Sequence, residues 1–393
     1  MLSNRLLRDH PDIVRAGLRR RGDSEALHTL EEWLRLDGER RTLANESAEA
    51  DVDRAQLAII ETQMGAHALS LPNLPDVRTP DGATSAQNVE LRRWGEIVPP
   101  AFPARTHEQL ATTLGILDLP RATKLAGPRF PLLVGAGARL ARALESFLLD
   151  LHHANGYIEV APPHLLKMET LEGTGHLPRH ADALFTLERG HFYLSPTAEA
   201  QLVALHADEV LPERRLPLAY TACTPCFRRE AGSSGAAMRG LLRQRQFDKV
   251  ELVRITSPES ADAAFETLIG HAERALQILD LPYRAVVLCC GELPFAAQRT
   301  VDLEVWLAGE ARYVEIASIS DCGTFQSRRL KMRYRPHSGG RARYPSTLNG
   351  SALPIGRTIA ALLERGQQPD GSILLPEALA RYFGDGSLRS GGQ

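Results

Sequence analysis

The residues with the clearest chemical potential lie in residues 227–251, where charged and aromatic side chains flank a Gly/Ser turn. In an extended chain alternate side chains share a face, so Arg228 and Glu230 are expected to lie together before the turn. After the turn the same spacing groups three side chains, Phe247, Lys249 and Glu251. Arginine binds phosphate oxygens through paired hydrogen bonds, an aromatic ring stacks on a base, and carboxylates accept hydrogen bonds from amino groups. The segment therefore predicts a nucleotide site, with an ordinary solvated hairpin as the alternative.

A hydroxyl and a carboxylate form a second pair, Thr197 and Glu199, in the segment Leu194-Ser-Pro-Thr-Ala-Glu. If this segment is extended, the two side chains share a face and can together hold the ammonium group of an amino acid. A threonine at this place is equally suited to cap the start of a helix. The sequence alone leaves both alternatives open.

A third group lies in residues 347–364, which are typical of a strand that runs into a helix. Asn349 and Ser351 share one face of that strand, and Pro354 suits the first position of the helix. Arg357 then lies in the opening turn, where the helix N-terminus adds positive potential that favours a phosphate. The segment therefore predicts an arginine that points toward a bound phosphate.

Other segments must position these side chains. Residues 129–166 are typical of a strand, a turn, a long helix and a second strand that ends at Pro162. Taken alone, this pattern favours a core helix with an edge strand. Residues 301–307 and 313–322 each predict a strand of a central sheet.

The first hundred residues are predicted to be helical and to end in a Pro/Gly-rich linker. Apolar side chains recur at helical spacing in three segments, residues 4–20, 25–50 and about 52–69. Pro72 stops the pattern. Because the second and third helices meet near Ala50, they are expected to form an antiparallel hairpin.

The composition of the 393 residues is that of a globular protein, with 43% hydrophobic and 24% charged residues. This length suits one large domain and a smaller one. The sequence has no run of 18 apolar residues that would predict a membrane span, and its first residues lack the apolar core of a signal peptide. A cytoplasmic location is therefore expected. The net charge of −2 indicates that any contact with RNA must come from a local patch.

The cysteines indicate neither a disulfide framework nor a metal site. Five cysteines, an odd number, argue against paired disulfides. Cys223 and Cys226 have the spacing of half a zinc site, but no second pair of ligands follows at a suitable distance. We therefore expect no zinc, and buried thiols in strands instead.

Taken in order, these segments resemble the class II aminoacyl-tRNA synthetases, and specifically the bacterial-type seryl-tRNA synthetases. Residues 129–166, 227–251 and 347–364 resemble the three motifs of that class. Gly173-Thr-Gly-His-Leu-Pro resembles the family's mobile loop over the amino-acid pocket, and residues 194–199 resemble its serine-binding element. Five such segments in the right order make the resemblance specific.

The resemblance implies an α+β fold in two parts. Residues 101–393 are expected to form the class II catalytic domain, a mainly antiparallel sheet flanked by helices. Residues 1–100 are expected to form an N-terminal antiparallel helical hairpin, a shortened form of the tRNA-binding arm, with the linker. The resemblance also implies a homodimer formed through residues 129–166, and no membrane association.

The implied activity is that of a serine–tRNA ligase, which uses ATP and Mg²⁺ to convert L-serine to seryl-adenylate and then transfers the seryl group to the 3′ end of tRNA(Ser). The resemblance assigns serine binding to Thr197, Glu199, Arg228, Glu251, Asn349 and Ser351. It assigns ATP binding to Arg228, Arg229, Glu230, Phe247, Glu315, Ser318 and Arg357. Glu315 and Ser318 would also hold Mg²⁺, a cation that prefers oxygen ligands. Arg228 and Arg357 would stabilise charge during catalysis.

The chain departs from the family pattern at several positions and in its arm. Arg245 stands where the family usually has histidine, and Ala317, Ile319 and Asp321 replace serine, cysteine and asparagine. In residues 26–71, nine acidic residues against four arginines give a net charge of −5, whereas a face that binds RNA should be basic. Helices of about 25 residues are also only about 37 Å long.

The short acidic arm supports a rival hypothesis, in which the protein activates serine or a similar small amino acid for a carrier protein or a biosynthetic partner. A non-catalytic regulatory homologue is a third hypothesis. The presence of Arg228, Glu251, Glu315 and Arg357 argues against a loss of catalysis.

Overall fold

An eight-stranded sheet forms the centre of the computed structural model, which describes residues 1–46, 52–230 and 240–390. In the order in which they lie side by side, its strands are β1 (Val89–Trp94), β9 (Tyr283–Val287), β10 (Arg299–Leu307), β11 (Arg312–Asp321), β13 (Ser346–Pro354), β8 (Gln246–Thr256), β7 (Leu218–Phe227) and β2 (Ile158–Glu159). Neighbouring strands are antiparallel except β2 and β7, which are parallel. This mixed, mainly antiparallel sheet confirms the predicted fold class.

Smaller sheets lie around the central one. One consists of β6 (Val210–Pro212) and β12 (Arg333–Arg335), and another of β14 (Ile373–Leu374) and β15 (Ser387–Leu388). In the third, β5 (Phe192–Leu194) lies between β3 (Leu165–Lys167) and β4 (Thr186–Leu187). The helices that follow the linker are α5 (His107–Thr113), α6 (Leu119–Ala126), α7 (Ala136–Ala154), α8 (Met168–Thr174), α9 (Ala198–Ala204), α10 (Ala261–Ile278), α11 (Phe325–Arg329), α12 (Ile355–Gly366) and α13 (Glu377–Phe383). Apolar side chains of α7, α10 and α12 share one buried cluster with the sheet.

Along the strands, successive side chains point alternately into the apolar core and to a polar face of the sheet. On β8, Val250 and Leu252 are fully buried in the apolar cluster. Between and beside them, Lys249 and Glu251 point to the opposite face. Because the sequence of β8 has this period of two, one strand supplies both core packing and charged groups for a site.

The N-terminal region begins with two short helices rather than the single helix predicted for residues 4–20. They are α1 (Asn4–Asp9) and α2 (Pro11–Arg20). The prediction was wrong because Pro11 has no backbone N–H and therefore starts a new helix at its first turn.

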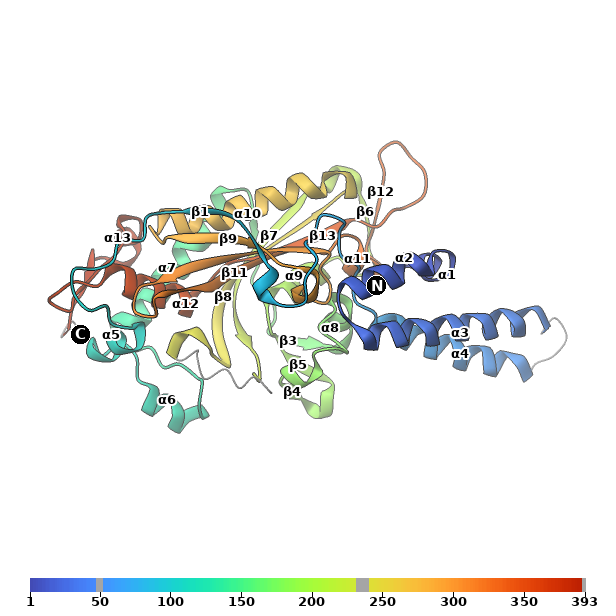
Figure 1. The fold of residues 1–393 in the computed structure, drawn as a ribbon, viewed down its shortest axis with the longest axis horizontal. Coiled ribbons are helices and arrows are strands. Elements are labelled where there is room, and N and C mark those ends of the chain that lie inside the picture. Colours follow the sequence, from blue (N-terminus) through green and yellow to red (C-terminus); the bar gives the residue numbers. More distant parts are fainter. Residues whose placement is uncertain (47–51, 231–239, 391–393) are drawn as a thin grey trace.

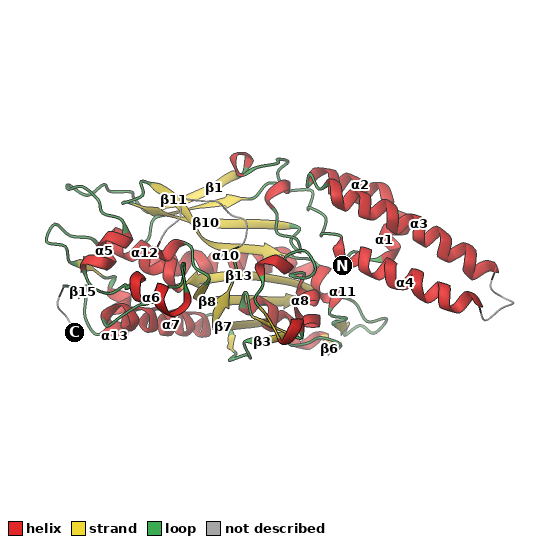
Figure 2. Ribbon diagram, turned by 90° about the horizontal axis from the view of Figure 1, so that it is seen from below, coloured by secondary structure: helices red, strands yellow, loops and turns green. Residues whose placement is uncertain are grey.

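The two longer N-terminal helices, α3 (Ser24–Glu46) and α4 (Val52–Ser70), form the predicted antiparallel hairpin. Figures 1 and 2 both show this pair extending away from the sheet. Trp33 and Leu30 are fully buried at its base. With 23 residues, α3 is about 35 Å long. The predicted turn near Ala50 lies outside the described residues.

Residues 129–166 differ in detail from the prediction. The long helix is present as α7 and ends, as expected, before a strand. The predicted first strand is only an isolated bridge between Leu133 and Leu117. The second strand, β2, has two residues and ends before Pro162, and both of its side chains are exposed at the edge of the sheet. In the described residues, no helix is long and apolar enough to cross a membrane.

Candidate active site

A cavity of about 570 Å³ opens over the polar face of the sheet. Its walls come from β8, β11 and β13, from the N-terminal ends of α9 and α12, and from irregular segments that include residues 294–297. It gathers eleven of the predicted site residues, Thr197, Glu199, Arg228, Glu230, Phe247, Glu251, Glu315, Ser318, Asn349, Ser351 and Arg357. Arg229 is the exception, because it lies outside the cavity lining, with its backbone N–H bonded to Ala183 O (2.9 Å).

Thr197 lies at the N-cap of α9, so the prediction of an extended segment was wrong and the capping alternative was right. Its Oγ1 accepts a hydrogen bond from the Glu199 N–H (3.2 Å). The same hydroxyl donates to Glu251 Oε2 (2.9 Å) and accepts from Lys249 Nζ (2.9 Å). Lys249 also forms an ion pair with Glu251. All three side chains are almost completely buried, so the helix cap is also part of the cavity floor.

Lys249 was predicted to share a face with Phe247 and Glu251 but was given no role. Its ammonium now explains how the buried Glu251 carboxylate is tolerated, because a buried charge needs a partner. Alternation along β8 was the signal that placed it correctly.

Glu199 occupies the same end of the cavity. Its Oε1 accepts a hydrogen bond from Gln326 Nε2 (2.7 Å). Gln326 is itself fully buried and accepts at Oε1 from Thr347 Oγ1 (2.7 Å). Burial, and then the nearby Glu251 carboxylate, raise the pKa of Glu199 to about 7. The carboxylate is therefore held in place but changes its charge near neutral pH.

Arg228 and Glu230 line the cavity, but they do not share one face of a strand as predicted. Strand β7 ends at Phe227, and Glu230 has a φ of 52°, so the two-residue alternation stops there. Arg228 remains beside β8, with its guanidinium 5.3 Å from the centre of the Phe247 ring. The Glu230 carboxylate accepts from Arg243 Nε (2.7 Å). The shared-strand geometry was wrong, although the predicted grouping around one space was right.

Arg357 lies in the first turn of α12, as predicted. The helix begins at Ile355, so Pro354 is its N-cap residue and not its first residue. Arg357 Nη1 donates to the backbone oxygen of Glu315 (2.6 Å) and lies 3.3 Å from the carboxylate oxygen Oε1 of the same residue. The arginine of α12 and the carboxylate of β11 are therefore in direct contact.

Asp302 is a carboxylate that the sequence analysis missed. It lies on β10 directly opposite Ser318 of β11. Its Oδ1 is buried and has no hydrogen-bond partner among the described residues. Burial, together with the nearby Glu315, raises the pKa of Asp302 well above its ordinary value. The alternating pattern of residues 301–307 contained this signal, because it gives the strand a second, polar face.

The oxygen atoms of Asp302, Glu315 and Ser318 are of the kind that a divalent cation prefers. The described residues contain no cluster of three or more His, Cys, Asp or Glu side chains that could hold a metal alone. Asp302, Glu315 and Ser318 nevertheless offer two carboxylates and a hydroxyl, and one carboxylate oxygen has no partner. Mg²⁺ is commonly bound by one or two carboxylates together with the phosphates of a substrate. The donor set therefore suits a cation that arrives with a nucleotide.

His176 lines the cavity and was not selected by sequence reasoning. Its Nδ1 lies 2.9 Å from Thr174 Oγ1, in the segment that begins at Gly173. Burial, and then the Arg228 charge, lower the pKa of His176 to about 3. The imidazole is therefore neutral at physiological pH and does not add to the positive charge of the cavity.

The residues that depart from the family pattern lie outside the cavity lining. Ala317 and Ile319 are buried in the apolar core and alternate with Ser318, which faces the cavity. Asp321 forms an ion pair with Arg299 (3.0 Å), so its charge has a partner. Arg245 is also absent from the cavity lining, and its backbone N–H donates to Arg129 O (2.8 Å).

The cysteines are all free thiols. Cys226 is buried in β7 and Cys223 is half-buried on the same strand. Burial raises the pKa of both thiols. Cys322 lines the cavity, where its Sγ lies 3.8 Å from Asn349 Oδ1.

Comparisons with known proteins agree on one family. The model of the tRNA synthetase class II core domain (G, H, P, S and T) matches residues 185–366. The serine–tRNA ligase of Synechococcus sp. (strain JA-3-3Ab) is 43% identical, and the alignment covers 99% of this chain and 100% of that protein. That of Fervidobacterium nodosum is 51% identical over 83% of this chain and 76% of its own length.

Solved structures give the same result. The seryl-tRNA synthetase from Pyrococcus horikoshii complexed with ATP is 31% identical, with a TM-score of 0.85 and coverage of 99% of this chain and 100% of that one. The cytoplasmic serine–tRNA ligase from Naegleria fowleri in complex with AMP is 26% identical, with a TM-score of 0.87 and coverage of 100% and 99%.

Proposed function

This chain belongs to the seryl-tRNA synthetases, and on that premise we propose that its cavity joins L-serine to ATP and supplies the resulting seryl group to tRNA(Ser). The activity is that of a serine–tRNA ligase. The observation that carries the proposal is the cavity itself, in which buried carboxylates line one end and arginines, with Glu315 and Ser318, line the other.

The end that contains Thr197, Glu199 and Glu251 suits serine. An ionised Glu199 would accept hydrogen bonds from the serine ammonium group. Glu251, on the floor, would accept from the serine hydroxyl, and Ser351 and Asn349 line the same cavity. A site that is built to bond a hydroxyl rejects analogues that lack it, because its own polar groups would then stay unpaired.

The other end suits the phosphates of ATP. Arg228 would bind the α-phosphate, since it stands between the serine end and the Phe247 ring on which adenine would stack. Arg357, near Glu315, would neutralise charge on the departing phosphates, and the N-terminus of α12 adds to this potential. Arg229 supports this end only through its backbone contact, so we assign it no direct role.

The first reaction needs no covalent attachment to the enzyme. A serine carboxylate oxygen forms a bond to the α-phosphorus of ATP, the bond to the β-phosphate oxygen breaks, and pyrophosphate leaves with that electron pair. The protein contributes by alignment of the two substrates and by stabilisation of the negative charge on the phosphates. Arg228 and Arg357 carry this role in the proposal.

Mg²⁺ would be held by Glu315, Ser318 and Asp302 together with ATP oxygens. When bound, it neutralises phosphate charge and orients the leaving group. The unpartnered Oδ1 of Asp302 supports this assignment.

In the second reaction the 3′ end of tRNA would take the seryl group from the adenylate. The family relationship favours tRNA over a carrier protein as the acceptor, although the hairpin of α3 and α4 is acidic. We infer that the protein acts in the cytoplasm, where tRNA is charged. We also infer a homodimer through residues 129–166, because β2 is an exposed sheet edge and Ile158 is 56% exposed. Sedimentation at micromolar concentration would test the dimer, and a monomer would contradict it.

Two assays test the function. Serine-dependent exchange of labelled pyrophosphate into ATP reports the first reaction, and attachment of labelled serine to total tRNA reports the second. We expect both with serine, and much weaker exchange with alanine, which lacks the hydroxyl. Exchange without attachment to tRNA would favour the carrier-protein hypothesis. Absence of exchange with every amino acid would favour the non-catalytic one.

A further inference from the structure

One wall of the cavity is an irregular segment, Leu293–Gln298, which we call the pocket wall. Pro294, Ala296 and Ala297 of this segment line the cavity. The pocket wall lies outside the helices and strands, so its backbone carbonyl groups cannot be paired within regular structure. Buried carbonyls need hydrogen-bond partners, and the partners of these carbonyls come from the first eighty residues of the chain.

Arg21, at the C-cap of α2, holds three of these carbonyl groups. Its guanidinium donates to the backbone oxygens of Leu293 (3.0 Å), Pro294 (3.2 Å) and Ala297 (2.5 Å). The same side chain donates to Asn73 O (2.6 Å). Only a planar guanidinium has donors that spread widely enough to reach all of these acceptors at once.

The remaining carbonyl groups of the pocket wall are held by the linker. The backbone N–H of Asn73 donates to Phe295 O (2.9 Å), and its Nδ2 donates to Ala296 O (2.9 Å). The N–H of Asp76 donates to Gln298 O (2.8 Å). All six consecutive carbonyl oxygens of the pocket wall therefore accept hydrogen bonds from the N-terminal region.

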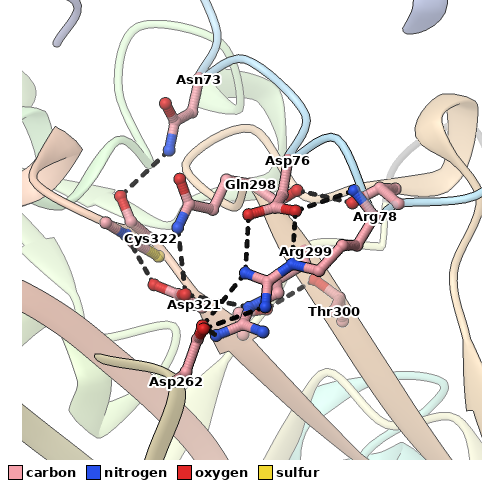
Figure 3. Close-up of polar contacts among 12 residues, drawn as sticks. Asn73, Asp76, Arg78, Asp262, Gln298, Arg299, Thr300, Asp321 and Cys322 are labelled. Atoms are coloured by element: carbon pink, nitrogen blue, oxygen red, sulfur yellow. Dashed lines mark hydrogen bonds and ion pairs between the residues drawn. The ribbon is translucent and has the colours of Figure 1, made fainter. Parts of the chain in front are cut away.

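Asn73 also connects the pocket wall to the strand beside it. Its Nδ2 donates to Cys322 O (3.0 Å), a contact that Figure 3 shows. The Cys322 thiol in turn lies 3.8 Å from Asn349 Oδ1, at the end of the cavity proposed for serine. The Phe295 side chain is buried in the apolar cluster of α1 to α4. The pocket wall is thus packed against the N-terminal region on one side and borders the serine end on the other.

A separate set of contacts fixes the C-terminal end of the pocket wall to the sheet. In Figure 3, Asp321 accepts hydrogen bonds from Gln298 Nε2 (3.0 Å) and from Arg299 Nε (3.0 Å). Asp262 also accepts from Arg299. This end of the segment is therefore held by side chains of the catalytic domain, whereas its carbonyl edge is held by residues 21–76.

The positive charge of the Arg21 guanidinium is stabilised by the dipoles of these carbonyl groups. Among the described residues it makes no ion pair with a carboxylate, and burial lowers the pKa of its guanidinium to about 10. It is still protonated at neutral pH. Even a half-buried cation is costly unless its hydrogen bonds are made, so these bonds favour one relative position of α2 and the pocket wall.

We propose that Arg21 and Asn73 are positioning residues that set the shape of the serine end of the cavity from the N-terminal region. The inference rests on the proposed function, because serine binding is its readout. Neither side chain would touch the substrate. Any movement of α2 and the attached hairpin would alter the affinity for serine and leave the ATP end, which is built on β8, β11 and α12, unchanged.

The test compares two variants with two controls in serine-dependent pyrophosphate exchange. Arg21→Lys keeps the charge but cannot reach every carbonyl, and Asn73→Ala removes the bonds to Ala296 and Cys322. We expect the KM for serine to rise about tenfold or more in both, because small displacements of substrate-positioning groups have effects of this size. The KM for ATP should change by less than about twofold.

The controls separate positioning from general loss of stability. Arg19→Ala removes an exposed charge from the same helix end, and both KM values should stay at the wild-type level. Arg8→Ala removes two hydrogen bonds (2.7 Å each) to the buried Asp37 within the N-terminal helices. It should lower the melting temperature without a selective effect on serine.

The outcomes are distinct. An unchanged KM for serine in both variants, or equal rises for serine and ATP, would overturn the inference while the proposed function stands. A rise for serine in Arg8→Ala as large as in Arg21→Lys would overturn it as well. A wild-type protein without serine-dependent exchange would overturn the proposed function, and this inference with it.

Discussion

The pH dependence of serine activation provides a direct test of the role assigned to Glu199. Its pKa is raised to about 7 by burial and by Glu251. If the ionised carboxylate binds the serine ammonium group, activity requires the deprotonated form. The substitution that tests this is Glu199→Gln, because the amide oxygen keeps an acceptor for Gln326 Nε2 and removes the titration.

The expected magnitude follows from the pKa. With a value near 7, about a tenth of the carboxyl groups are ionised at pH 6 and about nine tenths at pH 8. We therefore expect kcat/KM for serine to rise about tenfold between these pH values, with a midpoint near 7, because this parameter reports ionisation of the free enzyme. In Glu199→Gln the profile should be low and flat.

The same shift has a consequence for stability. Because the folded state binds the proton more tightly than the unfolded state, the penalty is absent below pH 4.5, the ordinary value, and grows until the pH passes 7. The difference between a pKa of 4.5 and one of about 7 corresponds to an upper bound of about 3.4 kcal/mol. Glu199→Gln should therefore melt at a higher temperature than the wild type at pH 8 and at nearly the same temperature at pH 4.5.

The assay is pyrophosphate exchange across pH 5.5–9, paired with thermal unfolding at both ends of the range. His180 lines the same cavity but has a pKa that burial lowers, so His180→Gln should keep the midpoint near 7. A Glu199→Gln variant that still shows the tenfold rise with that midpoint would refute the reasoning.

Three other substitutions test the cavity. Arg228→Ala should reduce kcat/KM for ATP by about 100-fold or more with little change in melting temperature, and an unchanged exchange rate would contradict its assigned contact with phosphate. Lys249→Met should lower the free energy of unfolding by about 3 kcal/mol, because it leaves the buried Glu251 carboxylate without its cation; denaturant titration measures this, and equal stability would show that Thr197 suffices. Asp302→Asn should increase the Mg²⁺ concentration needed for half-maximal exchange by about tenfold, and an unchanged Mg²⁺ titration would remove Asp302 from the cation site.

The sequence was sufficient to predict which side chains lie near one another, but not the backbone conformation that brings each of them there. Thr197 and Glu251 were both assigned to the serine end, and they lie in hydrogen-bond contact. The alternation of side chains could not show that Thr197 caps a helix. The capping hydrogen bond, from the Glu199 N–H to Thr197 Oγ1, forms only when the following residues make a helical turn. The order of the motifs along the chain predicts the fold as a whole. The local conformation at each site residue depends on contacts with segments that are distant in the sequence.

Two differences between the sequence-based expectations and the structure have identifiable causes. Asp302 was overlooked because residues 301–307 were treated only as a core strand, and its importance depends on a neighbour in β11 that pairing brings opposite. Arg229 was assigned to ATP binding by the family resemblance, but it lies outside the cavity lining, next to Glu230, where φ is positive. A local change of backbone conformation of this kind is not visible in a pattern of residue types.

The hydrogen bonds to the pocket wall also bear on where this protein can be divided. The sequence predicts a domain boundary near residue 100, and a fragment that begins there is a natural choice for isolating the ligase core. Such a fragment would lack the N-terminal donors to all six wall carbonyls, including Arg21, which lies 276 residues from Ala297 in the chain. If the proposed positioning role of Arg21 and Asn73 holds, serine binding depends on both parts of the chain, and any change to the arm must keep residues 21–76.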